Sequence, residues 1–233
     1  MWSHGAVAAD EPSTPEAEDL VRFMRMVSHG LRNPLAIATG MLDMLEQLAG
    51  AQLDDESREL LTRSSAAVHR TADMVLSVQR YIGAQHRPLQ TGPVDLGEVA
   101  RWVAEQLDPA EVVVHVADGL PTLTADQDMV EWVFHELFDN ARRHAGDGGV
   151  VTVNVELDRE DDRWLVSVTD DGAGIPAERH EDAFGEGDRL GRSGGGLGLG
   201  LPTVRAVLSR HGGEAWLEDA PDGGLRVVTA WPA

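Results

Sequence analysis

Four segments of the chain carry residue types whose spacing could support chemistry. The first is SHGLRNPL, residues 28–35, where His29 takes the outermost position of a heptad whose seam holds Met24 and Val27. An outward-facing imidazole can attack a phosphoryl group as a nucleophile. Pro34 interrupts the same helical pattern and is expected to kink the helix beside the histidine. An ordinary solvent-facing histidine explains this segment as well, so the segment alone does not decide.

The second segment, residues 136–144, places polar side chains on one face of a predicted helix. Glu136, Asn140 and His144 are four residues apart and therefore share that face. The Asn140 side-chain oxygen could ligate Mg²⁺, with Glu136 as a further candidate ligand, because this ion prefers oxygen donors. Arg143 and His144 could supply positive charge to phosphates. The alternative is the polar outer face of an amphipathic helix.

The third segment, DDGAGIP, follows a predicted strand at residues 164–170. A carboxylate at the end of a strand, here Asp170, can accept a hydrogen bond from an exocyclic amine such as that of adenine. Gly172 and Gly174 would let the backbone approach such a ring closely. A tight Asp-Gly turn is the alternative interpretation.

The fourth segment, GGGLGLGLP, residues 194–202, leads directly into a predicted helix. Free backbone N–H groups and the positive end of the helix dipole make such a junction suitable for binding phosphates. Pro202 suits the first helical turn. A flexible glycine linker is the alternative. No register of this segment gives the G-x-G-x-x-G fingerprint after a strand, so a dinucleotide-binding fold is not indicated.

Two long helices must position the first segment. Apolar residues three and four apart predict a helix from residue 19 to Ala49, and a seven-residue repeat predicts a second from about Asp54 to about Ile82. The seam of the first helix consists of Met24, Val27, Leu31, Pro34, Ala38, Met41, Leu45 and Leu48. Each helix would be about 45 Å long. We expect a hairpin, residues 19–83, whose two copies pair into a dimeric four-helix bundle. An antiparallel coiled-coil spacer explains the same pattern.

The remaining chain predicts a second domain with mixed secondary structure. Residues 1–18 are interpreted as a flexible leader, 84–93 as a linker and 94–233 as a catalytic domain. The expected helices are 96–107, 126–144 and 202–211, and the expected strands are 111–116, 150–157, 164–170, 214–218 and 225–231. Helices and strands do not alternate strictly, which favours an α+β two-layer sandwich over a doubly wound sheet.

The composition excludes several classes of protein. A formal charge of −21, from 40 acidic and 19 basic residues, argues against nucleic acid or a membrane surface as the main partner. All basic residues are arginine, so a Walker lysine and a protein-kinase lysine are both excluded. Without cysteine there is no disulfide or thiolate metal site. No apolar run is long enough to span a membrane, and we expect a cytoplasmic location.

Taken in order, the four segments resemble the H, N, G1 and G2 boxes of the sensor histidine kinases. SHGLRNPL is similar to the family's S-H-E-L-R-[TN]-P-L, and NARRH to N-A-x-[KR]-[YH]. DDGAGIP is similar to D-x-G-x-G-I-P, and GLGLGL to G-x-G-L-G-L. The resemblance covers about residues 19–233. It implies a dimerisation and phosphoacceptor hairpin followed by an ATP-binding domain of the Bergerat fold.

The resemblance also implies a role for each matching residue. His29 would accept the γ-phosphoryl group of ATP and pass it to an aspartate in the receiver domain of a response regulator. Asn33 matches the position associated with dephosphorylating that regulator. The implied ATP-binding residues are Asn140, which would also hold Mg²⁺, Arg143, His144, Asp170, Gly172, Gly174, Gly196, Gly198, Leu199, Gly200 and Leu201.

Two positions depart from the family's pattern. Gly30 stands where the family has an acidic residue, and losing general-base help typically costs ~10²–10⁴ in rate. Gly187 stands where a second aromatic residue usually follows Phe184. Gly30 therefore leaves open a phosphotransferase or phosphatase-biased module with weak autokinase activity. Another Bergerat-fold ATPase, such as an anti-sigma serine kinase, and a coiled-coil scaffold are the further alternatives.

Overall fold

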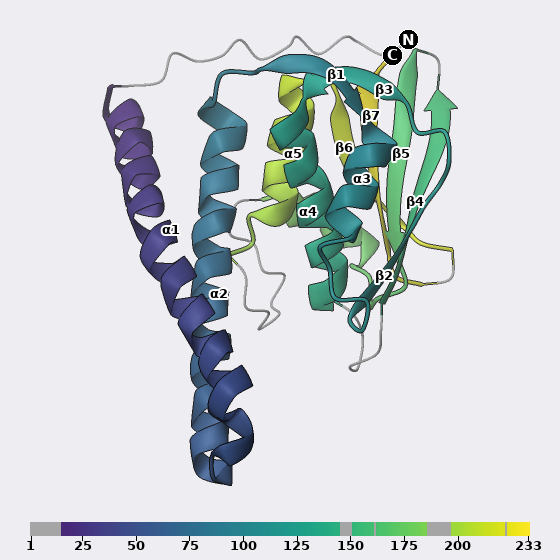
Figure 1. Ribbon diagram of the computed structural model, residues 1–233. Coiled ribbons are helices and arrows are strands. Elements are labelled where there is room, and N and C mark those ends of the chain that lie inside the picture. The colour runs from purple at the N-terminus through teal and green to yellow at the C-terminus, as the bar shows by residue number, and fades with distance from the viewer. Residues whose placement is uncertain (1–14, 145–150, 161, 186–196, 222) are drawn as a thin grey trace. The chain divides into compact units, whose positions relative to one another are not determined.

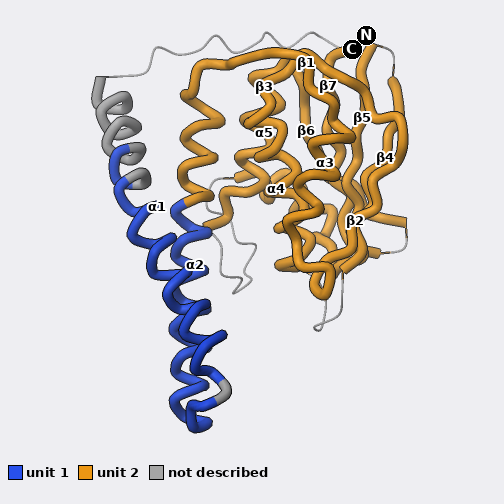
Figure 2. The backbone as a smooth tube through the Cα atoms, in the orientation of Figure 1, with its two compact units in different colours: residues 1–75 blue, residues 76–233 orange. Residues whose placement is uncertain are grey.

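The computed structural model describes residues 15–144, 151–160, 162–185, 197–221 and 223–233, with backbone alone for residues 15–25, 28, 29 and 51. The chain divides into two compact units, residues 1–75 and 76–233 (Figure 2). Most of the predicted leader, residues 1–14, lies outside the described residues, whereas Pro15–Glu18 already belong to the first helix. Among the described residues, no helix is both long enough and apolar enough to cross a membrane.

The first unit is a helical hairpin. Helix α1 (Pro15–Ala49) continues through Pro34, and a short 3₁₀ turn, η1 (Gly50–Gln52), leads to α2 (Asp55–His86). Asp54 caps α2, since its Oδ1 accepts a hydrogen bond of 2.7 Å from the Ser57 N–H. Hydrogen bonds from Ser57 lower the pKa of this carboxyl. The Nε2 of His69 on α2 lies 3.5 Å from Asp43 Oδ1 on α1 and so links the two helices.

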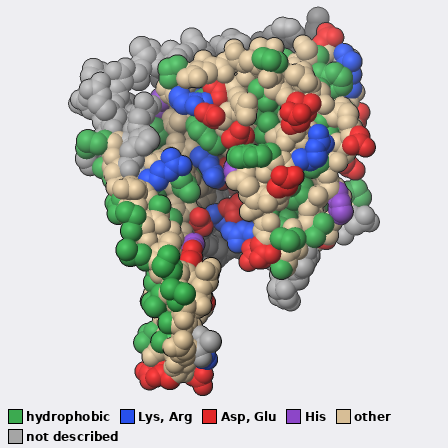
Figure 3. Space-filling model, in the orientation of Figure 1, with side chains coloured by type: hydrophobic (Ala, Val, Ile, Leu, Met, Phe, Trp, Pro, Cys, Tyr) green, Lys and Arg blue, Asp and Glu red, His purple; other side chains and the backbone are tan. Residues whose placement is uncertain are grey.

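The hairpin leaves much of its predicted seam uncovered. Seam residues Leu31, Met41, Leu45 and Leu48 are 44–72% exposed, and apolar side chains gather along the hairpin surface (Figure 3). The other large exposed apolar residues of the hairpin are Met26, Ile37, Met44 and Leu60. A stripe of this kind is unfavourable in water, because burial of apolar area is the main driving force of association.

The second unit contains the end of α2 and a two-layer arrangement of helices on sheets. Its further elements are β1 (Thr91–Asp95), α3 (Leu96–Ala104), β2 (Val112–Val116), β3 (Thr122–Asp126), α4 (Gln127–His144), β4 (Val151–Glu160), β5 (Arg163–Asp170), η2 (Ala177–Arg179), η3 (Asp182–Phe184), α5 (Gly200–Arg210), β6 (Glu214–Asp219) and β7 (Leu225–Pro232). The main sheet has the order β2-β4-β5-β7-β6. Only β2 and β4 are parallel.

Helices α3, α4 and α5 cover one face of this sheet (Figure 1). The core lies between the layers, where Val153, Val166 and Val227 of the strands are buried together with Phe138 of α4 and Val207 of α5. The helical hairpin followed by an α/β sandwich with a mixed sheet confirms the predicted fold class. The predicted helices and strands of this unit occur with small shifts at their ends.

The segment 84–93 and the strands β1 and β3 differ from the prediction. The segment 84–93, predicted as a linker, contains the last turn of α2 and the start of β1. Strand β1 pairs antiparallel with β3 to form a second sheet, in which Thr91 opposes Asp126 and Asp95 opposes Thr122. Strand β1 was not predicted because it contains Pro93, and proline is found in sheets mainly at edges. The proline is tolerated here because both strands of this two-stranded sheet are edge strands.

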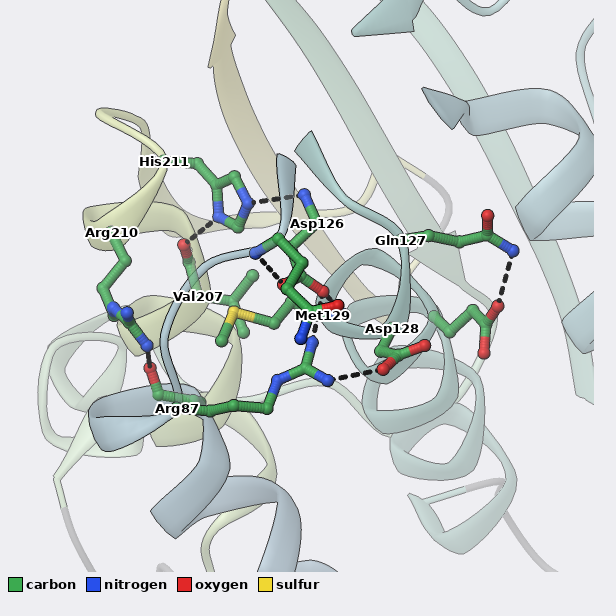
Figure 4. A network of polar contacts seen from close by, with 11 residues as sticks. Arg87, Asp126, Gln127, Asp128, Met129, Val207, Arg210 and His211 are labelled. Atoms are coloured by element: carbon green, nitrogen blue, oxygen red, sulfur yellow. Dashed lines mark hydrogen bonds and ion pairs between the residues drawn. The ribbon is translucent and has the colours of Figure 1, made fainter. Parts of the chain in front are cut away.

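A buried carboxylate fixes the start of α4 (Figure 4). Asp126 is 1% exposed and is ion-paired with Arg87, which follows α2. Its oxygens also accept hydrogen bonds from the N–H groups of Gln90, at 2.8 Å, and Met129, at 3.3 Å. The Asp126 N–H donates to His211 Nε2 at 3.0 Å. The end of α2, the start of α4 and the end of α5 are therefore tied to one residue.

We predict a measurable acid sensitivity from His135 on α4. Burial lowers the pKa of His135 from 6.5 to about 4, and Arg80 adds to the effect. The fold thus favours the neutral imidazole, so this contribution to stability is complete above pH 6.5 and is lost as pH falls toward 4. As the pH falls from 6.5 to 4, the unfolding free energy of His135→Gln should therefore drop by about 1–2 kcal/mol less than that of the parent. This figure is reduced from the full pKa shift because His135 is partly exposed to solvent.

The measurement is urea unfolding of both chains at several pH values. His115→Gln, at an exposed position on β2, is the matched control and should follow the parent. An unchanged pH dependence in His135→Gln would contradict the prediction.

Candidate functional site

The second unit contains a cavity of about 300 Å³. It lies where the second half of α4, the end of β5 and the start of α5 meet. The lining residues are Ser77, Glu136, Asp139, Asn140, Arg143, His144, Asp170, Gly174, Ile175, Pro176, Arg179, Ala183, Leu197, Gly198, Leu199, Gly200, Leu201, Pro202 and Leu225. Five segments far apart in the sequence therefore form one site, because Ser77 of α2 and Leu225 of β7 also line the cavity.

Most of the residues that the sequence analysis singled out for nucleotide binding line this cavity. Gly172 lies next to it rather than in its wall, and Gly196 falls outside the described residues. The candidate phosphoacceptor His29 and Asn33 belong to α1 in the first unit. Asn33 is exposed, whereas the side chain of His29, including its predicted outward direction, is not among the described parts.

Asp170 ends β5 at the inner wall of the cavity and is 9% exposed. Its Oδ1 accepts hydrogen bonds from the N–H groups of Gly172, at 2.9 Å, and Leu225, at 3.2 Å. Burial raises the pKa of this carboxyl, although the two hydrogen bonds oppose the shift. Both of these hydrogen bonds use Oδ1, and neither occupies Oδ2.

Gly172 and Gly174 are required by the protein's own backbone around Asp170. A Cβ at Gly172 would lie 2.8 Å from the carbonyl oxygen of His144 and 2.9 Å from Asp170 Oδ1. Gly174 has a φ of +65°, and a Cβ there would lie 2.7 Å from the carbonyl oxygen of Gly224. The sequence predicts that these glycines make room for a ligand. The structure shows that they also make room for neighbouring peptide groups.

The polar face of α4 is partly occupied by ion pairs. Asp139 binds Arg142 at 2.7 Å and Arg143 at 2.5 Å. Arg143, predicted to supply charge to phosphates, therefore has its charge partly compensated by a residue of the same helix. Asn140 is half-buried and lines the cavity.

Glu136 is a buried charge in the cavity wall, with 5% exposure. Its Oε1 lies 3.1 Å from Arg80 Nη1, contributed by α2. Burial raises the pKa of Glu136, and Arg80 opposes this shift. The start of α5 approaches from the other side, since a Cβ at Gly200 would lie 3.0 Å from Glu136 Oε2.

The sequence analysis missed the contribution of α2 to this site. Ser77 lines the cavity and Arg80 holds Glu136, yet the heptad pattern assigned α2 to the hairpin alone. One signal was present in the sequence. Ser77, Arg80 and Ala84 are spaced by three and four residues, so they mark a second face of the helix, and Ser77 and Ala84 are both buried.

Contacts of Arg205 on α5 hold the residues that follow DDGAGIP in place. Arg205 binds Glu181 through two contacts of 2.7 and 3.0 Å, and these hydrogen bonds lower the pKa of Glu181. The same guanidinium lies 3.9 Å from the ring centre of Phe184, a cation–π contact. Phe184, predicted as the first aromatic of the loop, is 5% exposed. Gly187, predicted to replace the second aromatic, lies outside the described residues.

Two family models match consecutive parts of the chain. Residues 19–80 match the His Kinase A (phospho-acceptor) domain. Residues 125–233 match the Histidine kinase-, DNA gyrase B-, and HSP90-like ATPase family. The order of these matches is the order of the helical hairpin and the α/β sandwich.

Curated proteins with similar sequences include sensor kinases. The chain is 30% identical over 219 residues to the adaptive-response sensory kinase SasA of Crocosphaera subtropica, which covers 87% of this chain and 56% of the relative. It is 30% identical over 223 residues to the alginate biosynthesis sensor protein KinB of Pseudomonas aeruginosa, covering 90% of this chain and 36% of the relative. The chain thus spans about half the length, or less, of these relatives.

Solved structures give the same assignment of the fold. Full-length ShkA in complex with AMPPNP is similar with a TM-score of 0.65 and 24% identity, covering 91% of this chain and 45% of that one. The mycobacterial sensor histidine kinase MprB is similar with a TM-score of 0.53 and 27% identity, and the match covers 61% of this chain and 97% of that one. With both domains matched in order, the chain belongs to the sensor histidine kinases of two-component systems.

Proposed function

We propose that this chain binds ATP in the cavity of its second unit and phosphorylates itself on His29. The observation that carries the proposal is the meeting of Asp170, Asn140 and residues 197–201 in one cavity. Each of these elements suits a different part of a nucleotide. The match of residues 19–80 to the His Kinase A (phospho-acceptor) domain supports an acceptor histidine in the hairpin.

The cavity walls suit the two ends of ATP. Asp170 Oδ2 would accept the hydrogen bond of the adenine amine, while Gly174 and Ile175 flank the base. The phosphates would face the backbone of Gly198, Leu199, Gly200 and Leu201, where α5 begins and N–H groups have no helical partner. Arg143 and His144 would add positive charge from α4.

Asn140 fits an Mg²⁺ ion held jointly with the nucleotide. Among the described residues, no group of three or more His, Cys, Asp or Glu side chains could hold a metal by itself. An ion that keeps several waters and binds phosphate oxygens requires few protein ligands, and one amide oxygen meets this need. Glu136, already paired with Arg80, is the weaker candidate. When bound, the ion would offset charge on the phosphates.

The transfer itself requires positioning more than covalent help from the protein. A ring nitrogen of His29 would attack the γ-phosphorus, forming an N–P bond as the bond to the β–γ bridging oxygen breaks and ADP leaves. The phosphoryl group would then pass to an aspartate of a response-regulator receiver domain. Asn33, one turn after His29 and exposed, would position water for dephosphorylating that regulator.

The hairpin surface supports a homodimer as the working form. The exposed seam of Leu31, Met41, Leu45 and Leu48 would be covered by a second hairpin in a four-helix bundle. Because the reaction consumes ATP and the chain lacks cysteine, we propose a cytoplasmic location for this part of the protein.

Gly30 favours a second candidate function, a phosphotransferase or phosphatase-biased module. This residue leaves the position next to His29 without the acidic side chain that the family carries there. General-base help typically contributes 10²–10⁴ in rate, so its loss would make autophosphorylation slow, about a hundredfold or more below that of related kinases.

Incubation with γ-labelled ATP tests the proposed function. We expect acid-labile label on the parent chain and none on His29→Gln, because only the imidazole of residue 29 accepts the phosphoryl group. His69→Gln, at an exposed histidine of the same hairpin, is the matched control and should retain the label. Label that persists in His29→Gln would refute the assignment. A parent chain that binds ATP but takes no label would favour the second candidate.

The role of Gly30 is tested by restoring the carboxylate. Gly30 is exposed, and a Cβ there meets nothing within 4 Å, so the glutamate side chain fits without displacement. Gly30→Glu should autophosphorylate about a hundredfold faster than the parent. Gly30→Gln has nearly the same size without a basic group, so it controls for the gain in helix propensity. Equal rates in the two variants would show that another group or water acts as the base.

A further inference from the structure

The carboxylate of Glu136 lies next to the start of α5, where the phosphates of the proposed nucleotide would bind and where a negative charge would repel them. It is in the cavity wall with one oxygen 3.1 Å from Arg80 Nη1. Its other oxygen lies next to Gly200, the first residue of α5. A buried carboxylate at the start of a helix interacts with the same dipole end and N–H groups that would bind phosphate.

The charges around Glu136 come from several elements. On α4, Asp139 raises its pKa and Arg143 lowers it, and these two residues are also paired with each other. Asp170 of β5, His144 of α4 and Arg179 of η2 line the same cavity. Arg80 on α2 is the cation that makes a direct hydrogen bond to the carboxylate.

We propose that Arg80 is the charge-compensating residue of the nucleotide site. It neutralises Glu136 and holds its carboxylate to one side, so that a triphosphate can approach the start of α5. Arg80 acts through Glu136 and is a positioning residue, since the cavity wall is formed by Glu136 rather than by Arg80 itself. This inference rests on the proposed binding of ATP.

A consequence of this arrangement is that part of α2 belongs functionally to the nucleotide site. Arg80 is 23% exposed and Glu136 5%, so the pair is largely removed from solvent. Breaking a buried ion pair by removing one partner leaves an uncompensated charge, which is costly and would repel phosphates close by.

Calorimetric titration of the whole chain with ATP in excess magnesium chloride, and separately with adenosine, tests the inference. At about pH 8, Arg80→Gln should bind ATP about tenfold more weakly than the parent and adenosine equally well.

Further variants separate charge compensation from a general loss of structure. Adding Glu136→Gln to Arg80→Gln should restore ATP affinity, since the unpaired charge is gone. Arg80→Lys keeps the positive charge and should retain most of the affinity. Arg63→Gln, which removes the same charge from an exposed site on α2, is the matched control.

Several outcomes would overturn the inference. One is ATP affinity in Arg80→Gln equal to that of the parent, and another is an equal loss for ATP and adenosine. If Arg80→Gln does not fold, weak ATP binding by Arg80→Lys overturns it equally. A parent chain that binds no ATP contradicts the proposed function and this inference with it. If the parent binds ATP and no substitution changes the affinity, only this inference is rejected.

Discussion

The candidate site depends on the burial of one carboxylate at the end of a central strand. Asp170 leaves β5 in the middle of the sheet, and its Oδ1 accepts from two backbone N–H groups, one in the following turn and one at the start of β7. These bonds fix the carboxylate, and they bring the loop after β5 against β7. A side chain at Gly172 or Gly174 would collide with backbone atoms there. Asp170, Gly172 and Gly174 are therefore required by the local fold itself, whether or not a ligand is bound.

The second constraint is the placement of charge around the proposed nucleotide site. The cavity contains several acidic side chains, and two of them have an arginine partner: Arg80 for Glu136 and Arg143 for Asp139. In a chain with a formal charge of −21, such pairing lowers the negative charge that the proposed triphosphate would meet. The arginine on Glu136 comes from α2, the helix whose earlier residues belong to the first unit.

Much of this could be predicted from the sequence, because local rules govern the elements concerned. Periodicity located the hairpin helices, and the glycine-rich run before Pro202 predicted the start of α5. The four-residue spacing of Glu136 and Asn140 correctly placed both on one face of α4, where they line the cavity. The contact of Arg80 with Glu136 could not be predicted, because it joins residues 56 positions apart and follows no local pattern. The same holds for the pairing of β1 with β3, which depends on a strand that contains a proline.

The central claim is that Asp170 recognises adenine, and the measurement that tests it most directly is calorimetric titration of Asp170→Asn with ATP. The asparagine oxygen can keep the two hydrogen bonds that Oδ1 accepts, while its NH₂ group replaces the acceptor Oδ2 with a donor. Two donors would then face each other, so the account predicts that ATP affinity falls at least about tenfold while the chain stays folded. Affinity equal to that of the parent in a folded Asp170→Asn chain would contradict the account.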